Sequence, residues 1–479
     1  MEIDYFEEPE LEFGINKHVD IRFGLANYYP VDYESPIAPK HIKLGIVGTS
    51  ESIEGLSSWI EKCRNEINEK ASNQPNLFPK FPGFNIESGF KSTILLDSKL
   101  TKAISNNELQ KLEEVKDINR RIEIATDLFV EELKYLREKA NPDVFVCAIP
   151  QQQLDLTTSL EEQEGELDYK IKSKQLDFHD LLKAKTMNLG IPIQLIIPST
   201  YDDSKRKAQK RNPALPRVVQ DEATRAWNFH TAIYYKSKGI PWRLVRNPSE
   251  FSTCYIGVSF YKTLDGSYLR TSVAQVFNER GEGVIVRGGF ANFDKIDRQV
   301  HLEEKDAQEL IENSLKIYRQ EHGNLPARIV VHKSSTYKHG EKQGFINGAL
   351  SCGIDKLDLL NIDKSFMRLF RTKQYPPLRG TYLKLDQTSS LLYTRGSVDF
   401  FSTYPGMYVP KSLLFQCEQV EESQKFLGKE ILALTKMNWN NTQFDGGMPI
   451  TLRAARQVSG ILRYTKDGDT IAPSYRFYM

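Results

Sequence analysis

The sequence has 479 residues, of which 40% are hydrophobic and 27% are charged, and its formal net charge at pH 7 is +1. Such a chain is too long for one ordinary hydrophobic core, and its composition is that of a globular protein with about two domains. No stretch approaches the ~20 apolar residues of a membrane-spanning helix, and the acidic amino terminus lacks an apolar signal core. The five cysteines are scattered along the chain. We therefore expect reduced cysteines, a cytoplasmic protein and no membrane segment.

The chain begins with a segment rich in turns and aromatic residues, which predicts an irregular layer ending at Pro39. Residues 42–48 follow as a buried-strand pattern, and a helix is expected around Trp59. Between Leu109 and Leu136 apolar residues recur at helical spacing. This periodicity predicts one long amphipathic helix.

Strand and helix patterns then alternate. Residues 144–149 predict a strand, and the polar stretch 151–175 predicts a loop. After a helix, a further strand is expected at 193–197 and another helix at 222–238. This order predicts an open α/β sheet.

Four polar residues in these units could bind one small anion. His179 and Lys183 are four residues apart and leave the same face of their helix. Gln194 lies near the start of the next strand, and Lys236 lies near the end of the following helix, with Lys238 as an alternative to it. Ligands collect at strand carboxyl ends in such sheets, and helix amino termini favour anions. Lysine supplies charge and the other two residue types supply directed donors, so the pattern predicts a phosphate site.

A basic stretch lies between the last two of these units and is a candidate for contacts with a nucleic-acid backbone. Its cations are Lys205, Arg206, Lys207, Lys210, Arg211 and Arg217. The alternative is a solvated loop that binds nothing.

From residue 248 onward the pattern changes to closely spaced strands, then a helix, then another strand. The predicted strands are 254–260, 270–277, 284–286 and 328–332, and the predicted helices are 304–321, 421–437 and 449–463. Three strands, a helix and a further strand are the order of an RNase H-like fold.

His179, Lys183, Gln194 and Lys236, in this order, resemble the residues with which the MID domain of Argonaute proteins holds the 5′ phosphate of a guide. The stretch 220–236 also resembles the short prokaryotic Argonautes. The resemblance covers nearly the whole chain. It implies an α/β protein in which a Rossmann-like MID domain is followed by an RNase H-like PIWI domain.

The implied MID domain spans residues 1–247, including the irregular amino-terminal segment, and the implied PIWI domain spans residues 248–479. No further domain of the longer Argonautes fits within this length.

Cutting members of that family hold two metal ions with acidic residues. At three of the corresponding positions this chain carries Ser259, Ser334 and Arg456, and two hydroxyls with a cation cannot hold two divalent ions. The fourth position is not assigned, although Glu279 and Glu282 lie nearby. The resemblance therefore implies a protein that binds a guide and a target but is not an enzyme.

The resemblance also implies a Mg²⁺ ion that the carboxylate of Met479 shares with the guide phosphate. The alternative for this segment is a frayed tail. The implied partners are a small guide RNA, a complementary single-stranded target DNA and an APAZ-domain effector protein, NAD-depleting or a nuclease, in prokaryotic immunity by abortive infection. Two other functions stay open, namely a metal-dependent guide-directed nuclease and a structural subunit that loads no nucleic acid.

Overall fold

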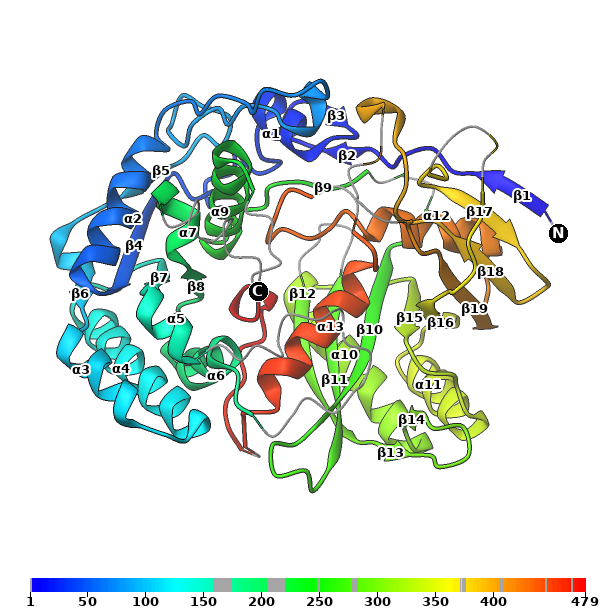
Figure 1. Ribbon diagram of the computed structural model, residues 1–479. Coiled ribbons are helices and arrows are strands. Elements are labelled where there is room, and N and C mark those ends of the chain that lie inside the picture. Colours follow the sequence, from blue (N-terminus) through cyan, green and yellow to red (C-terminus); the bar gives the residue numbers. More distant parts are fainter. Residues whose placement is uncertain are drawn as a thin grey trace.

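The computed structural model describes most of the chain. The described ranges are 2–157, 175–204, 220–245, 247, 250–277, 283–370, 372, 376–402, 404, 409–443, 446–466 and 468–479. Within them the chain forms two α/β lobes, each built on its own main sheet, and Figure 1 shows the last residue lying between the lobes.

The first lobe contains a sheet of five parallel strands. They are β4 (His41–Gly48), β5 (Thr93–Leu95), β6 (Thr101–Ala103), β7 (Val144–Ala148) and β8 (Ile193–Ile196). The order is β5-β4-β7-β8, with β6 also paired to β4.

Helices cover both faces of this sheet. They are α2 (Ser50–Lys62), α4 (Ile118–Lys139), α6 (Phe178–Thr186) and α9 (Glu222–Lys236). Val144 and Val146 of β7 pack in one core with α2 and α9, whereas Phe145 and Cys147 pack in another core with α4 and α6. Because both faces are buried, the strand is apolar throughout, as in a Rossmann-like sheet.

The long helix predicted between Leu109 and Leu136 is wrong, because the chain forms two helices here. The first is α3 (Asn106–Lys111), and α4 starts again after Asp117. The Asp117 carboxylate accepts a hydrogen bond from the Arg120 N–H at 2.7 Å, which caps the second helix. Part of the predicted loop after β7 is also helical, as α5 (Gln151–Thr157). Residues 158–174 lie outside the described ranges.

The second lobe contains a sheet of nine strands. They are β1 (Glu2–Tyr5), β10 (Thr253–Lys262), β11 (Leu269–Phe277), β12 (Gly283–Phe290), β15 (Arg328–Lys333), β16 (Lys356–Lys364), β17 (Thr381–Lys384), β18 (Ser389–Leu392) and β19 (Leu413–Gln419). Their order is β1-β17-β18-β19-β16-β15-β10-β11-β12. The antiparallel run β10-β11-β12 and the parallel neighbours β10, β15 and β16 give the RNase H-like arrangement.

Four helices flank this sheet. They are α10 (Glu304–His322), α11 (His339–Ser351), α12 (Gln424–Leu434) and α13 (Ile450–Leu462). Ile256 and Val258 of β10 share a core with α10 and α11, while Tyr255 and Tyr261 face the core that contains α12 and α13. Successive side chains of β10 therefore contact different cores on the two faces of the sheet.

The first strand of the chain belongs to the second lobe, although the sequence predicts an irregular layer with the first domain. Strand β1 pairs antiparallel with β17, and Glu2 lies opposite Lys384. Glu8, whose side chain is 11% exposed, then binds the buried cations of Arg379 at 2.8 Å and Lys436 at 3.0 Å. These contacts attach the amino-terminal segment to the sheet of residues 248–479.

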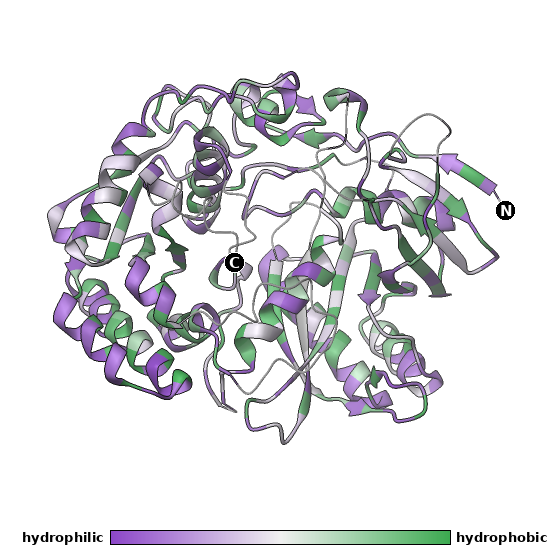
Figure 2. Ribbon diagram, in the orientation of Figure 1, coloured by the Kyte–Doolittle hydropathy of each residue, from purple (hydrophilic) through white to green (hydrophobic). Residues whose placement is uncertain are grey.

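The remaining elements of the described ranges are short. They are β2 (Leu11–Glu12), β3 (Lys17–His18), α1 (Ile21–Tyr28), α7 (Pro198–Tyr201), β9 (Arg243–Leu244), β13 (Asn292–Phe293) and β14 (Val300–His301), with 3-10 turns at Pro75–Leu77, Ser98–Leu100, Leu112–Glu114, Met187–Leu189, Asp399–Phe401 and Tyr475–Phe477. Figure 2 shows hydrophilic and hydrophobic residues interleaved along the helices, as amphipathic packing requires. Among the described helices, none has the length and apolar character that crossing a membrane would need.

Candidate functional site

Helix α6 begins with a carboxylate cap that fixes the orientation of its first two turns. The Asp177 side chain accepts a hydrogen bond from the Asp180 N–H at 2.7 Å. His179, in the first turn, has a 43% exposed side chain with Nδ1 2.9 Å from the Asp180 carboxylate. One turn later Lys183 is only 3% exposed. The helix thus presents an accessible imidazole and a buried ammonium group on one face.

Lys183 and Lys236 come together although 53 residues separate them in the chain. The Lys236 Nζ donates to the main-chain oxygen of Met479 at 3.0 Å, and the Lys183 Nζ donates to the same oxygen. Lys183 also donates to the Tyr478 carbonyl at 3.3 Å. The two predicted lysines therefore converge on one oxygen atom of the last residue.

Gln194 completes this cluster from strand β8. Its Oε1 accepts from the Lys236 Nζ at 2.7 Å, and its amide nitrogen donates to the Leu195 carbonyl at 2.8 Å. Lys238, the alternative distal lysine, is exposed and lies beyond the end of α9 with φ at 77°. The structure thus brings together Lys183, Gln194, Lys236 and Met479, with His179 on the same helix as the first of them.

The carboxyl-terminal segment reaches this cluster from the second lobe. The Ile285 N–H of β12 donates to the Pro473 carbonyl at 2.6 Å, and the Tyr478 hydroxyl donates to the Ala472 carbonyl at 2.9 Å. Met479 is 2% exposed. This packing contradicts the alternative of a frayed tail, and Figure 1 shows the segment ending beside α9 and β8.

The electrostatics of the cluster reflect buried positive charge. Burial lowers the pKa of Lys183 to about 8, although Asp180 and Asp177 oppose the shift. Burial and then the charge of Lys183 lower the pKa of Lys236 well below its ordinary value. The same two causes lower the pKa of His179, even though part of its ring is exposed. His179 is therefore a neutral imidazole at pH 7, which can donate one hydrogen bond.

One group of potential metal ligands occurs at the edge of this cluster. Asp177, His179 and Asp180 each offer a ligand atom, and these atoms lie within 4.8 Å of one another. Within the described ranges this is the only such group of three His, Cys, Asp or Glu residues. Its atoms already cap α6 and hold the imidazole, so the geometry gives it a structural role.

The sequence places Ser259, Ser334 and Arg456 where cutting relatives hold metal ions. In the second lobe, Ser259 lies on β10 and Ser334 directly follows the parallel strand β15. Val258 pairs with Lys333 across β10 and β15, so Ser259 and Ser334 each follow a paired residue at the same end of the sheet. Ser259 is buried, whereas Ser334 is half-buried.

Helix α13, which carries the third position, lies directly against these strands. It packs so closely on Gly257 that a Cβ there would collide with the Thr451 backbone. His332 Nδ1 is 2.8 Å from the Thr451 hydroxyl, and burial lowers the pKa of His332 to about 3, so the ring is neutral. Arg456 is half-buried on the same helix. Two serines, a neutral histidine and an arginine thus belong to these adjoining elements.

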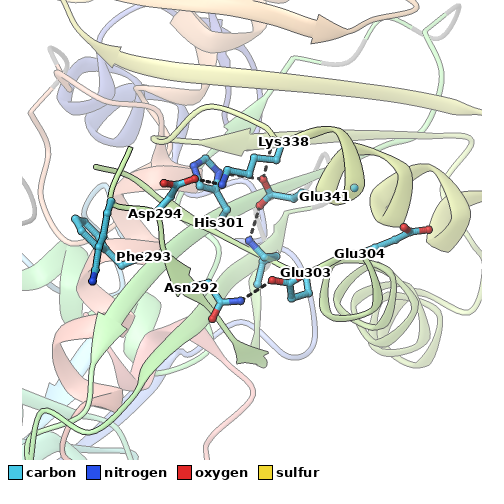
Figure 3. A pocket seen from close by; sticks show the side chains of 11 residues that line it. Asn292, Phe293, Asp294, His301, Glu303, Glu304, Lys338 and Glu341 are labelled. Atoms are coloured by element: carbon cyan, nitrogen blue, oxygen red, sulfur yellow. Dashed lines mark hydrogen bonds and ion pairs between the residues drawn. The ribbon is translucent and has the colours of Figure 1, made fainter. Parts of the chain in front are cut away.

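A separate cavity of about 540 Å³ lies in the second lobe, between the β13–β14 hairpin and the starts of α10 and α11. Figure 3 shows Lys338 pointing toward Asp294, to which it is ion-paired, and Asn292 donating to Glu303 at 2.6 Å. These side chains of its wall pair with one another, and we assign the cavity no ligand.

Several predicted residues fall outside the described ranges. Lys205, Arg206, Lys207, Lys210 and Arg211 of the basic stretch are among them, and so are Glu279 and Glu282. Their predicted roles stay predictions.

A contact that the sequence does not predict connects α6 to the second lobe. The Asp177 N–H donates to the Tyr464 hydroxyl at 2.8 Å, across 287 residues of sequence. Asp177 itself carries a detectable signal, an Asp directly before a helical pattern. Tyr464 carries none, because no local pattern reports a contact between distant segments.

Comparison with known proteins rests on structure alone. The sequence matches no family model and no curated protein. Clostridium butyricum Argonaute bound to a guide DNA and a 19-mer target DNA superposes with a TM-score of 0.66 at 16% identity, over 98% of this chain and 53% of that one. Drosophila Piwi gives a TM-score of 0.58 at 12% identity, over 100% of this chain and 56% of that one. Marinitoga piezophila Argonaute in complex with a 5′ OH guide RNA gives a TM-score of 0.54 at 11% identity, over 100% of this chain and 59% of that one.

This chain therefore spans somewhat more than half the length of the structures it resembles. At these identities the likeness shows the fold. The predicted α/β fold class, a Rossmann-like part followed by an RNase H-like part, is confirmed as the fold that these Argonaute and Piwi structures share with the chain.

Proposed function

We propose that this protein binds the 5′-phosphorylated end of a guide nucleic acid between its two lobes. The observation that carries the proposal is the convergence of the Lys183 and Lys236 ammonium groups on one main-chain oxygen, beside the Gln194 amide. Among the described residues, neither lysine pairs with a side-chain carboxylate. Even counted as a full carboxylate, Met479 supplies one negative charge to the two buried lysines, and the charges of Asp180 and Asp177 only partly oppose the lowered pKa of Lys183.

A phosphate monoester supplies the missing charge. It carries about 1.5 to 2 negative charges at pH 7 and three strong acceptor oxygens. The lowered pKa values of Lys183 and Lys236 express the energetic cost of burying ammonium groups without enough negative charge. A guide with a 5′ hydroxyl would leave that cost unrelieved. The cluster therefore favours a guide with a phosphorylated 5′ end.

The donor set also suits Mg²⁺ once a phosphate is bound. The main-chain oxygen of Met479 and the side-chain oxygen of Gln194 are hard donors of the kind that Mg²⁺ prefers. Both oxygens accept hydrogen bonds from lysine in this structure. We infer that phosphate oxygens draw the lysines toward themselves, and that Mg²⁺ then neutralises the repulsion between phosphate and the Met479 carboxyl group.

We further propose that the guide is an RNA and that the target is a complementary single-stranded DNA. Marinitoga piezophila Argonaute is described in complex with a guide RNA that has a 5′ OH, and Clostridium butyricum Argonaute is described with a guide DNA and a 19-mer target DNA. The basic stretch that contains Arg206 and Lys207 would add contacts to the nucleic-acid backbone. This chain would thus act as the guide-loaded sensor of a short prokaryotic Argonaute system in the cytoplasm.

We propose that this sensor does not cut its target. Metal-dependent cutting needs carboxylates that hold two ions about 4 Å apart. Ser259 and Ser334 offer neutral hydroxyls, and Arg456 offers a cation that repels metal ions. Because binding alone harms no invader, the output would come from an APAZ-domain effector protein, NAD-depleting or a nuclease.

One experiment tests the sensor against the nuclease alternative. Purified protein is loaded with a 5′-phosphorylated guide RNA, mixed with end-labelled complementary DNA and Mg²⁺ or Mn²⁺, and examined both for target retention on a filter and for cleavage on a gel. We expect retention of complementary but not scrambled DNA, with the DNA intact. A cut at one defined position opposite the guide would establish the nuclease, and failure to retain either DNA would leave only a structural subunit.

A further inference from the structure

The segment that follows β16 exposes two phenylalanine rings to solvent. Phe366 is 91% exposed and Phe370 is 85% exposed, which makes them the most exposed aromatic side chains in the described part of the chain. A large apolar side chain placed in water at this level gains nothing for the fold. Two strongly exposed rings within one five-residue segment favour an interaction site.

The segment is anchored to the body of the second lobe. The Ser365 N–H donates to the Ser412 carbonyl at 2.9 Å, and the Ser412 hydroxyl donates to the Met367 carbonyl at 3.4 Å. The Leu369 N–H donates to the Tyr393 hydroxyl. The backbone between the two rings is therefore held by Tyr393, which directly follows β18, and by Ser412, which directly precedes β19.

The two rings lie at the same edge of the sheet as the altered metal positions. Strands β10, β15 and β16 are parallel, with Val258 beside Lys333 and Lys333 beside Asn361. Ser334 directly follows β15, and Phe366 lies two residues after the end of β16. A nucleic-acid strand that passes the carboxyl ends of these β-strands would thus meet the rings next.

Cations accompany the rings. The Lys411 Nζ lies 5.9 Å from the centre of the Phe366 ring, and the Arg368 guanidinium is held against the Ser365 and Met367 carbonyls at 3.1 and 3.0 Å. Lys364 adds a third positive charge at the end of β16. Aromatic rings among lysine and arginine are the combination that binds single-stranded nucleic acid, since bases stack on the rings and phosphates meet the cations.

We propose that Phe366 and Phe370 form a stacking platform for unpaired bases of a nucleic-acid strand that leaves the guide–target duplex. The proposal rests on the proposed function and adds a second contact, far from the 5′-phosphate cluster in sequence. The unpaired bases come either from the target beyond the guide or from the 3′ end of the guide itself. Both sources present the same chemistry, and targets of different length separate them.

The test uses the double variant Phe366→Ala/Phe370→Ala in the full chain loaded with a 5′-phosphorylated guide RNA. Both rings are exposed, so the variant keeps the fold. Phe251→Ala is the matched control, because Phe251 is 48% exposed with the Lys356 Nζ 4.7 Å from its ring, at the opposite end of the same strands. Fluorescence anisotropy gives the dissociation constants for three targets, one ending flush with the guide, one extending beyond it, and one leaving the guide 3′ end unpaired.

We expect the double variant to weaken binding of one of the two complexes with unpaired bases by ~5 to 150-fold per stacked base. The flush duplex and the control variant should bind as the unmodified protein does. Which of the two complexes is weakened identifies the strand that supplies the bases.

The platform would be overturned if the double variant bound all three targets as tightly as the unmodified protein does. It would also be overturned if the flush duplex lost as much affinity as the complexes with unpaired bases. Retained nucleic-acid binding with loss of a co-purifying protein would also overturn it, by assigning the rings to a protein interface. Failure of the proposed function gives a different result, namely no dependence on the guide 5′ phosphate in any variant.

Discussion

Replacing Lys236 with methionine tests the phosphate cluster most sharply. Methionine keeps the length and apolar stem of the side chain but removes the ammonium group that contacts Gln194 and Met479. A hydrogen bond from a charged group to phosphate contributes about 1.5 to 3 kcal/mol, which corresponds to ~10 to 150-fold in affinity. We expect this loss for 5′-phosphorylated guides and little change for the 5′-hydroxyl guide of the same sequence.

The same substitution should not destabilise the free protein. Burial lowers the pKa of Lys236 well below its ordinary value, so the ammonium group is costly in the absence of a ligand. The relief of this cost opposes the loss of the hydrogen bonds that Lys236 Nζ donates to Ile193, Gln194 and Met479, so the variant should unfold at a temperature close to that of the unmodified protein. This result separates lost recognition from lost folding.

Titration of labelled guides against the protein, followed by anisotropy, supplies the measurement. Lys238→Met is the control, since it makes the same change two residues later at an exposed position. Equal losses for phosphorylated and hydroxyl guides would refute the assignment of Lys236 to the phosphate, as would an equal effect of the control.

Three further outcomes are expected. The pKa of Lys183 is about 8 in the free protein, and a bound phosphate raises it. Affinity for 5′-phosphorylated guides should therefore fall as pH rises above about 8, while affinity for 5′-hydroxyl guides should depend less on pH. An affinity for phosphorylated guides that does not change with pH would contradict this. The double variant Ser259→Asp/Ser334→Asp should still fail to cut with Mn²⁺, because Arg456 still occupies the third predicted ligand position with a cation. A guide-directed product on a gel would show otherwise. Glu8→Gln should lower the free energy of unfolding by about 3 to 5 kcal/mol, since it leaves two buried cations without their anion, and urea unfolding would reveal a smaller effect if the network is dispensable.

The sequence predicted the cluster because its members carry local signals. Four-residue spacing placed His179 and Lys183 on one helix face, and the end of a helix marked Lys236. Strand periodicity likewise predicted β10 and β15, which the structure extends by one to three residues. Residues whose spacing follows a local period can thus be assigned from the sequence alone.

Contacts between distant segments were beyond such reasoning. Strand β1 pairs with β17, which lies about 380 residues later in the sequence. The pattern of a four-residue strand does not predict which other strand it pairs with. The break before α4 was missed because Asp117 caps a helix within a continuous apolar period, so the capping signal competed with the periodicity. The exposure of Phe366 was also invisible, since the sequence alone does not distinguish an exposed aromatic residue from a buried one.

Protection of the guide phosphate from a phosphatase tests the central claim most directly. A guide RNA carrying a labelled 5′ phosphate is bound by excess protein, treated with alkaline phosphatase and followed over time. Because Lys183, Lys236 and Met479 are buried between the lobes, we predict that bound guide keeps its label long after free guide has lost it. Release of the label at the rate of free guide, under conditions in which the guide stays bound, would contradict the account.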